Sequence, residues 1–299
     1  MNIRDLEYLL SVAELGHFGK AADACFVSQP ALSMQIKKLE ENLGVKLLER
    51  THKSVLLTDH GVKIAKQARQ ILDLTKDIKD VAKSAKDPFG GEIRIGIFPT
   101  LAPYFLPVII PKLSKTYPKL SFYLIEEKTA TLIEQLQNGK LDAAFLAFPV
   151  IEKNFRSALL FEEEFLLATP KKHPLAKLKY VGQNDLKNEE LLLLNEGHCM
   201  RDQALAVCNR IKIHENQNFR ATSLETLRHM ISAGVGITLM PKLACTESTT
   251  ISYIPFSTPK SIRSIGLFWR VSLAKQVLLK HIVNEIKLIF KDREASVKN

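Results

Sequence analysis

The chain has little cysteine for its 299 residues. Its four cysteines, Cys25, Cys199, Cys208 and Cys245, form no CxxC pair and have no regular spacing. A small secreted scaffold needs many cysteines in a short chain, and a zinc ribbon needs paired ones. Both classes are excluded, and reduced thiols in the cytoplasm are expected.

Long apolar runs are also missing. The longest, such as residues 143–147 and 191–194, fall far short of the ~20 residues that span a bilayer. The N-terminal segment carries Asp5 and Glu7 where a signal peptide has an apolar core. We therefore expect a cytoplasmic protein that contacts no membrane.

The composition is that of an ordinary globular protein of about two domains, with 46% hydrophobic and 25% charged residues. The 42 Lys+Arg exceed the 32 Asp+Glu and give a net charge of +10, which favours nucleic-acid binding. Residues 1–60, however, hold 7 Lys+Arg and 8 Asp+Glu, a net charge of −1. The location of a nucleic-acid site must therefore come from residue patterns.

The first 60 residues are predicted to form short helices, and the third has clear ends. Ser28 is a good N-cap, Pro30 falls in the first turn, and Gly44 is a stop signal. Between them, apolar residues recur every three or four positions: Leu32, Ile36, Leu39 and Leu43. These residues predict an amphipathic helix.

The outward face of that helix carries Gln29, Ser33 and Lys37 at i, i+4 and i+8, which is the pattern of a recognition helix. Residues 49–58 carry a basic tip before a β-prone run, as in a wing that touches the DNA backbone. The alternative for each feature alone is a solvated helix or a charged loop. The candidate DNA contacts are Gln29, Pro30, Ser33, Lys37, Arg50, Thr51 and Lys53.

Residues 58–86 predict one long helix, because apolar positions from Ile64 to Ala85 alternate in steps of four and three. A helix of this length extends ~40 Å, more than a 60-residue domain can cover. It needs a partner helix, most simply from a second copy of the chain. Residues 87–91 contain Pro and two Gly and mark a linker.

Beyond Gly91, strand and helix patterns alternate, as in the βαβ units of a parallel sheet. A second such unit follows later in the chain. Two sheets would leave a cleft between them. The expected elements are residues 92–98, 101–116, 120–125, 129–138 and 141–148, then 219–221, 223–233, 236–240 and 265–269.

This order of parts resembles the LysR-type transcriptional regulators over the whole chain. The residues that carry the resemblance are Ala21-Ala22, Val27–Ser33 and Leu39–Arg50. The resemblance implies an α/β protein with an α-rich winged helix-turn-helix DNA-binding domain (1–58), a linker dimerisation helix and hinge (59–90), and a two-lobed periplasmic-binding-protein-like effector domain (91–299). Lobe I would comprise about 91–162 and 269–299, and lobe II about 163–268.

Cys199 lies beside His198 and Arg201, two groups that favour a thiolate, and a thiolate attacks peroxide to give a sulfenic acid. Cys208 follows nine residues later. In a continuous helix the two would be ~13.5 Å apart along the axis. A disulfide needs Cα atoms within about 7 Å, so oxidation would require unwinding.

Two alternatives remain for this segment. Both cysteines could be small buried apolar residues. A metal site of His198, Cys199, Cys208 and His214 fits no common zinc spacing. Residues 197–204 with Cys208, and residues 219–227, resemble the hydrogen-peroxide-sensing members of the family, which implies a redox pair of Cys199 and Cys208.

The same resemblance implies a peroxide pocket of Thr100, Thr129, His198 and Arg270. The alternative for each threonine is a plain helix N-cap, and His198 could instead cap or pack. Cys25 is expected in the core of the DNA-binding domain. Cys245 receives no role from the resemblance.

Together these features predict a transcriptional activator that senses peroxide, without cofactor or metal and without enzymatic turnover. Its expected partners are double-stranded promoter DNA, further copies of itself in a dimer of dimers, RNA polymerase, and glutaredoxin or thioredoxin as reductant. One alternative is a regulator with a small organic ligand in the cleft and structural cysteines. The other is a thiol peroxidase-like enzyme.

Overall fold

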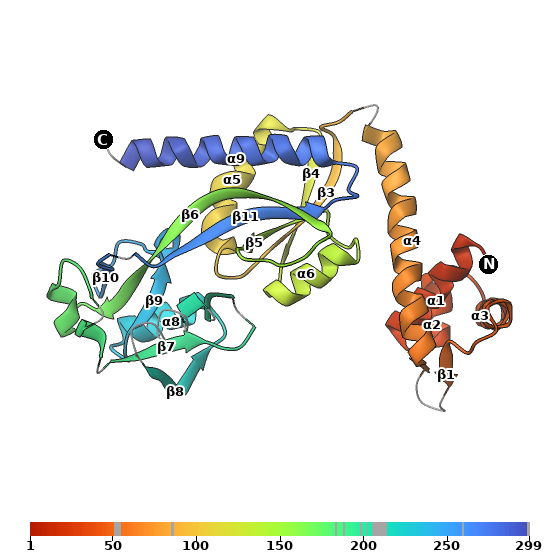
Figure 1. The fold of residues 1–299 in the computed structure, drawn as a ribbon, viewed down its shortest axis with the longest axis horizontal. Helices are drawn as coiled ribbons and strands as arrows, with labels where there is room; N and C mark the ends of the chain where they lie inside the picture. The colour runs from red at the N-terminus through yellow and green to blue at the C-terminus, as the bar shows by residue number, and fades with distance from the viewer. Residues whose placement is uncertain are drawn as a thin grey trace. The chain divides into compact units, whose positions relative to one another are not determined.

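A computed structural model gives the fold in two compact units, Met1–Lys86 and Asp87–Asn299 (Figure 1). The residues that it describes are 1–50, 55–84, 87–182, 184–187, 189–197, 199–201, 203–204, 214–258 and 260–297.

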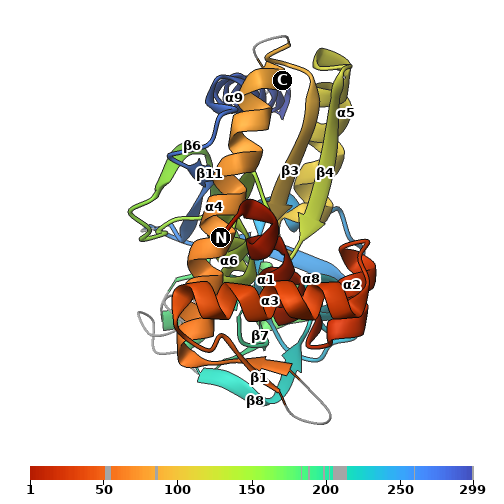
Figure 2. The ribbon, with the colours of Figure 1, turned by 90° about the vertical axis from the view of Figure 1, so that its right-hand side faces the viewer.

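The first unit consists of helices and one antiparallel hairpin. Its elements are α1 (Ile3–Leu15), α2 (Phe18–Ala24), α3 (Gln29–Leu43), β1 (Leu48–Arg50), β2 (Val55–Leu57) and α4 (Asp59–Ser84). Figure 2 shows α3 lengthwise, above the hairpin. The core between α1, α2 and α3 contains Leu9, Val12, Leu32, Ile36 and Leu39.

Helix α3 has the ends that the sequence predicts. The Ser28 hydroxyl accepts a hydrogen bond from Ala31 N at 3.4 Å, and Gly44 closes the helix with a φ of +67°. The predicted apolar positions Leu32, Ile36 and Leu39 are buried. The amphipathic helix and both of its end signals are confirmed.

Helix α4 begins in close contact with the residues around β1. The Thr58 hydroxyl accepts a hydrogen bond from Gly61 N at 2.9 Å and donates one to Lys46 O at 2.7 Å. A Cβ atom on Gly61 would lie 2.1 Å from the Leu47 carbonyl oxygen, so glycine permits this approach. The long helix is thus fixed to the hairpin at its first turn.

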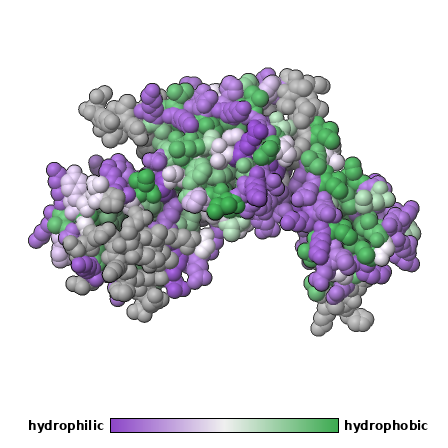
Figure 3. Space-filling model, viewed as in Figure 1, coloured by the Kyte–Doolittle hydropathy of each residue, from purple (hydrophilic) through white to green (hydrophobic). Residues whose placement is uncertain are grey.

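The remainder of α4 carries apolar side chains that the chain itself does not cover. Its exposed apolar residues are Val62, Ile71, Leu74 and Ile78, and Figure 3 shows apolar atoms at the surface of this unit. Such a row on a 26-residue helix is typical of a helix that packs against a partner.

The second unit begins with the predicted βαβ pattern. Strand β3 pairs in parallel with both β4 and β5. The elements are β3 (Gly91–Ile97), α5 (Ala102–Thr116), β4 (Leu120–Glu126), α6 (Thr129–Gln137) and β5 (Ala143–Ala147).

Two long strands add antiparallel pairs, which the sequence did not predict, to these parallel strands. Strand β6 (Phe155–Pro170) pairs antiparallel with β11 (Ile262–Arg270), and β11 pairs antiparallel with β5. The strands form one path, β10-β6-β11-β5-β3-β4, with β9 paired to β6. Strand β10 is Ile251–Pro255 and β9 is Thr238–Pro241. The sheet is therefore mixed and passes from one lobe to the other.

Two cores lie along this sheet. The first core includes Ile95, Phe105, Phe145 and Leu267; the second core includes Phe165, Leu192, Leu227 and Leu239. Around the second core lie η1 (Pro174–Lys177), η2 (Asn184–Leu186), β7 (Glu190–Leu194), β8 (His214–Ala221), α8 (Leu224–Ser232) and η3 (Lys242–Ala244), and α9 (Gln276–Val297) closes the unit against the first core.

Candidate functional site

The exposed face of α3 carries the polar residues that the sequence singles out. Gln29, Pro30 and Lys37 are exposed, and Ser33 is half-buried. Lys37 forms an exposed ion pair with Glu41 at 3.8 Å. The side chain of Arg50, and Thr51 and Lys53 entirely, lie outside the described residues.

A buried carboxylate holds α3 against the hairpin. Glu40, 5% exposed, accepts hydrogen bonds from Leu47 N at 2.9 Å and Leu48 N at 3.2 Å, and from Lys46 Nζ at 3.0 Å. Burial alone would raise the pKa of Glu40, but these bonds outweigh it and the pKa is lowered. Glu40 could not be singled out from the sequence, because its position in the helix resembles that of any solvated acidic residue.

Cys199 lies where the two cores meet. It is a half-buried thiol in a helical stretch, Cys199–Arg201, and it packs against the first core, whereas the next residue, Met200, is buried in the second core. The buried Arg201 donates to Leu194 O at 3.1 Å. His198 and Cys208 lie outside the described residues.

The turn before Cys199 is held from both lobes. Lys128, just before α6, donates to Glu196 O at 2.9 Å, and its side chain packs against Gly197. Asn195 N donates to Ala221 O at 2.8 Å on the other side. The start of α6 thus lies beside the segment that leads into Cys199.

Thr100 lies in a buried polar cluster at the turn between β3 and α5. It is 2% exposed and accepts hydrogen bonds from Arg263 at its hydroxyl (3.1 Å) and at its carbonyl (3.3 Å). Arg263 also donates from Nε to Glu163 at 2.7 Å, and Glu163 accepts from Leu243 N at 2.7 Å. Leu101, not Thr100, is the N-cap of α5, so the plain N-cap interpretation of Thr100 is wrong.

Thr129 is the first residue of α6, and Lys128 is the N-cap. The Thr129 hydroxyl oxygen is buried and has no hydrogen-bond partner among the residues that the structure describes. A plain N-cap is therefore excluded for this threonine as well. A buried hydroxyl without a partner is costly, and a bound polar molecule would relieve that cost.

Arg270 does not join this group. Its guanidinium donates to Leu136 O at 2.6 Å, in the last turn of α6, and to Leu141 O at 2.7 Å, just after that helix, whereas Thr129 lies at the other end of α6. Seven residues separate Arg263 from Arg270 on β11, about 23 Å at 3.3 Å per residue. We therefore correct the predicted pocket: Arg263 takes the place of Arg270 beside Thr100. The sequence offered both arginines on one strand and no local signal to choose between them.

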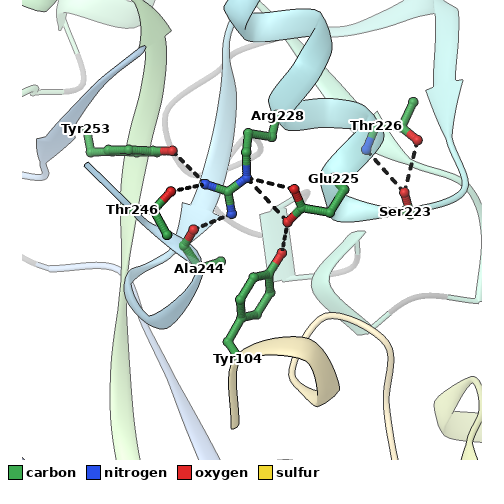
Figure 4. A network of polar contacts seen from close by, with 8 residues as sticks. All are labelled: Tyr104, Ser223, Glu225, Thr226, Arg228, Ala244, Thr246 and Tyr253. Carbon is green, nitrogen blue, oxygen red and sulfur yellow. Dashed lines mark hydrogen bonds and ion pairs between the residues drawn. The ribbon is translucent and has the colours of Figure 1, made fainter. Parts of the chain in front are cut away.

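A second polar network lies one turn further along α5 (Figure 4). Tyr104 donates to Glu225 at 2.5 Å, and Glu225 pairs with Arg228 at 3.1 Å. Arg228 also donates to Ala244 O, to Thr246 and to Tyr253. Burial and the bond to Glu225 raise the pKa of Tyr104 to about 12. The network joins α5 of the first core to α8 and η3 of the second.

The other two cysteines have different surroundings. Cys25 ends α2 and is half-buried against the core of the first unit. Cys245 follows η3, its thiol donates to Pro241 O at 3.4 Å, and burial raises its pKa to about 12. Among the described residues, no group of three or more His, Cys, Asp or Glu is placed to hold a metal ion.

None of the described helices is long and apolar enough to cross a membrane.

Comparison with known proteins defines the class. Residues 3–62 match the family model "Bacterial regulatory helix-turn-helix protein, lysR family", and residues 86–287 match "LysR substrate binding domain". The chain belongs to the LysR family of bacterial regulatory proteins.

Particular relatives are more specific. The chain is 48% identical over 273 residues to the "DNA-binding transcriptional dual regulator OxyR" of Escherichia coli K12, covering 90% of each chain. It is equally identical, over the same length, to a "Hydrogen peroxide-inducible genes activator" of Pectobacterium carotovorum. Its fold is similar to full-length OxyR C199D from Pseudomonas aeruginosa, with a TM-score of 0.79, 34% identity, and 96% and 95% of the two chains covered.

Proposed function

We propose that this protein is a DNA-binding transcriptional activator of the oxidative stress response that senses hydrogen peroxide through Cys199. The observation that carries the proposal is the position of Cys199, a half-buried thiol where the two cores of the effector unit meet. A chemical change of a side chain at such a junction alters the packing of both sides at once. The likeness to hydrogen peroxide-inducible genes activators favours hydrogen peroxide as the stimulus.

In the proposed chemistry, the Cys199 thiolate attacks one oxygen of hydrogen peroxide. An S–O bond forms, the O–O bond breaks, and the departing hydroxide takes a proton to leave as water. The Cys208 thiolate then attacks the sulfenic sulfur, so that an S–S bond forms and a second water leaves. Two thiols and one peroxide thus give one disulfide and two waters.

The pocket proposed for peroxide consists of Cys199, Thr100, Thr129, His198 and, in place of Arg270, Arg263. Thr100 is held by Arg263, and Thr129 has a buried hydroxyl that lacks a protein partner among the described residues. Peroxide is small and uncharged, and hydroxyl and guanidinium groups can hydrogen-bond to both of its oxygens.

The transition proposed for the protein follows from the geometry of a disulfide. Residues 199–201 are helical, and if the helix continued to Cys208, the two cysteines would be ~13.5 Å apart along its axis. In that case closing the bond would require the helix to unwind. The unwound segment would re-pack the effector units of a dimer of dimers and change the spacing of the DNA-binding domains on the operator.

The remaining parts of the proposal concern partners and domains. Residues 1–58 would bind double-stranded promoter DNA through the face of α3 and the wing. Residues 59–90 would pair two copies, and residues 91–299 would form the sensing lobes. The activator would act on RNA polymerase in the cytoplasm, without enzymatic turnover, and glutaredoxin or thioredoxin would reduce the disulfide.

One experiment tests the central step. Purified full-length protein is treated with stoichiometric peroxide, its thiols are mapped by mass spectrometry, and its footprint on promoter DNA is recorded. We expect a Cys199–Cys208 disulfide and a shifted footprint, both lost in Cys199→Ser and retained in the matched control Cys245→Ser. Intact thiols, or a footprint that still shifts in Cys199→Ser, overturn the proposal in favour of a ligand-controlled regulator. Continuous peroxide consumption with a dithiol indicates an enzyme.

A further inference from the structure

Phe26 projects from the turn between α2 and α3, and its side chain is 94% exposed. The sequence analysis assigned it no role. A large apolar side chain in a short turn between two packed helices normally points into the core. The neighbouring Val27 does so in part. In this turn an entire aromatic ring faces solvent instead.

The backbone of Phe26 has an unfavourable conformation. Its φ is +55°, in the left-handed region that favours glycine or asparagine and penalises a residue with a bulky side chain. The turn is nevertheless firmly held, because Phe26 N donates to Asp23 O at 3.1 Å and Val27 N donates to Ala22 O at 3.0 Å. The turn thus holds the backbone of Phe26 in place, at the cost of an exposed ring and a strained φ.

The position of Phe26 in the chain suggests which partner could contact its ring. Phe26 comes two residues before Ser28, the N-cap of α3, and the exposed residues Gln29 and Pro30 follow at once. Phe26 thus lies in the turn that leads directly into the face proposed to enter the major groove. At that place an apolar ring meets two apolar groups of duplex DNA, the deoxyribose of the backbone and the C5-methyl of thymine.

We infer that Phe26 is an apolar DNA-contact residue that packs against deoxyribose or a thymine methyl group beside the recognition helix. This inference depends on the proposed DNA binding. It adds to the polar contacts of Gln29, Ser33 and Lys37 a contact that is independent of charge. Strain and exposure located at one binding residue are typical of a functional surface.

The contact has a signature that distinguishes it from a phosphate contact. Loss of an apolar contact lowers affinity by the same factor at every salt concentration, whereas loss of a lysine–phosphate contact reduces the slope of log K against log salt by about 0.9. Loss of Phe26 should also relieve backbone strain when the replacement is asparagine, which tolerates the left-handed region.

The experiment uses the full-length protein under reducing conditions and a duplex that the wild type selects from a random pool. Affinity for it is measured at several salt concentrations for wild type, Phe26→Ala, Phe26→Asn, Lys37→Ala and the control Leu15→Ala, an exposed apolar residue at the end of α1. We expect both Phe26 variants to bind at least five-fold more weakly with an unchanged salt slope. Phe26→Asn should melt no lower than wild type, and Leu15→Ala should bind normally.

The outcomes separate the inference from the function on which it depends. If the wild type selects no duplex, the proposed DNA binding fails and the inference with it. If it selects one and both Phe26 variants bind that duplex as tightly as wild type, the inference alone is overturned. A loss of affinity that accompanies a change in oligomeric state also overturns it, because the ring would then contact a second copy. Replacing thymine by uracil in the duplex weakens wild type but not Phe26→Ala if the methyl is the contact, and leaves both unchanged if deoxyribose is.

Discussion

Two arginines of strand β11 show how burial and partners assign different roles to the same residue type. The side chain of Arg263 is fully buried, its guanidinium lies over the rings of Phe98 and Phe165, and it pairs with Glu163. Arg270 caps two carbonyls at the far end of the strand. This deeply buried charged pair is compensated by further hydrogen bonds, from Arg263 to Thr100 and from Leu243 N to Glu163.

Removal of Arg263 should therefore be costly. In Arg263→Ala, Glu163 stays buried without its counter-charge, and we expect the effector unit to lose about 3–5 kcal/mol of unfolding free energy. The matched control is Lys260→Ala, which removes an exposed partner of Glu164 just before β11 and should change stability little. Urea unfolding of both variants checks this, and equal stabilities would contradict it.

The cysteines differ for similar reasons. Burial keeps the Cys245 thiol protonated at neutral pH, with a pKa of about 12, and a protonated thiol is a poor nucleophile. Cys199 is half-buried beside a turn held by Lys128 and Arg201. At the scale of single residues, surroundings rather than residue type distinguish an inert thiol from a candidate sensor.

At the scale of elements, the DNA-binding unit depends on a junction between α3 and the hairpin. Glu40 contributes to that junction, because its carboxylate accepts hydrogen bonds from the backbone N–H groups of Leu47, just before β1, and Leu48, its first residue. One buried side chain of α3 thus contributes to holding the start of β1 against this helix.

The lowered pKa of Glu40 predicts a dependence on pH. A carboxylate whose pKa is lower in the folded state adds stability above its unfolded pKa of about 4.3, and this stability is lost as pH falls through the folded pKa. We expect Glu40→Gln to destabilise the first unit by about 1–2 kcal/mol at pH 7. The difference from wild type should shrink below about pH 4. Thermal unfolding across this range tests it, with Glu41→Gln, an exposed neighbour, as control; a difference independent of pH contradicts it.

At the scale of the whole molecule, most of the positive charge lies in the second unit, whereas a row of exposed apolar residues lies on α4 of the first unit. Residues 1–90 hold 14 Lys+Arg and 12 Asp+Glu, a net charge of +2, so +8 of the total +10 lies beyond them. Net charge therefore assists encounter with DNA but does not locate the binding face. The exposed apolar residues of α4 point instead to assembly from several copies.

Assembly through α4 gives a prediction for the whole molecule. In the double variant Leu74→Glu and Ile78→Glu, two exposed apolar positions on α4 become charged, which opposes burial against a partner helix. We expect the dimer to dissociate at micromolar concentration, as measured by sedimentation equilibrium. Val277→Glu, an exposed apolar position on α9, is the control and should leave assembly unchanged. Unaltered assembly of the double variant would show that α4 is not the contact.

Local sequence was sufficient for what neighbouring residues decide. The ends of α3 follow from Ser28 and Gly44, and its buried face from apolar residues three and four positions apart. The alternation of β3, α5, β4, α6 and β5 was also predictable, since each element has its own period. The exposed polar face of α3 was predictable in the same way, from the spacing of residues along the helix.

The tertiary structure decided what depends on residues far apart in the chain. Thr100 and Arg263 are 163 positions apart, and Glu163 and Arg263 are 100 apart, so no local pattern could choose Arg263 over Arg270. The antiparallel pairing of β6 with β11 and the exposure of Phe26 are further cases. The sequence by itself determined the ends and the buried face of α3, because these depend on contacts within one helix, and its resemblance to a known family indicated the class of protein. Which side chains surround the candidate sensor depends on strand register across the sheet, and only folding sets that register.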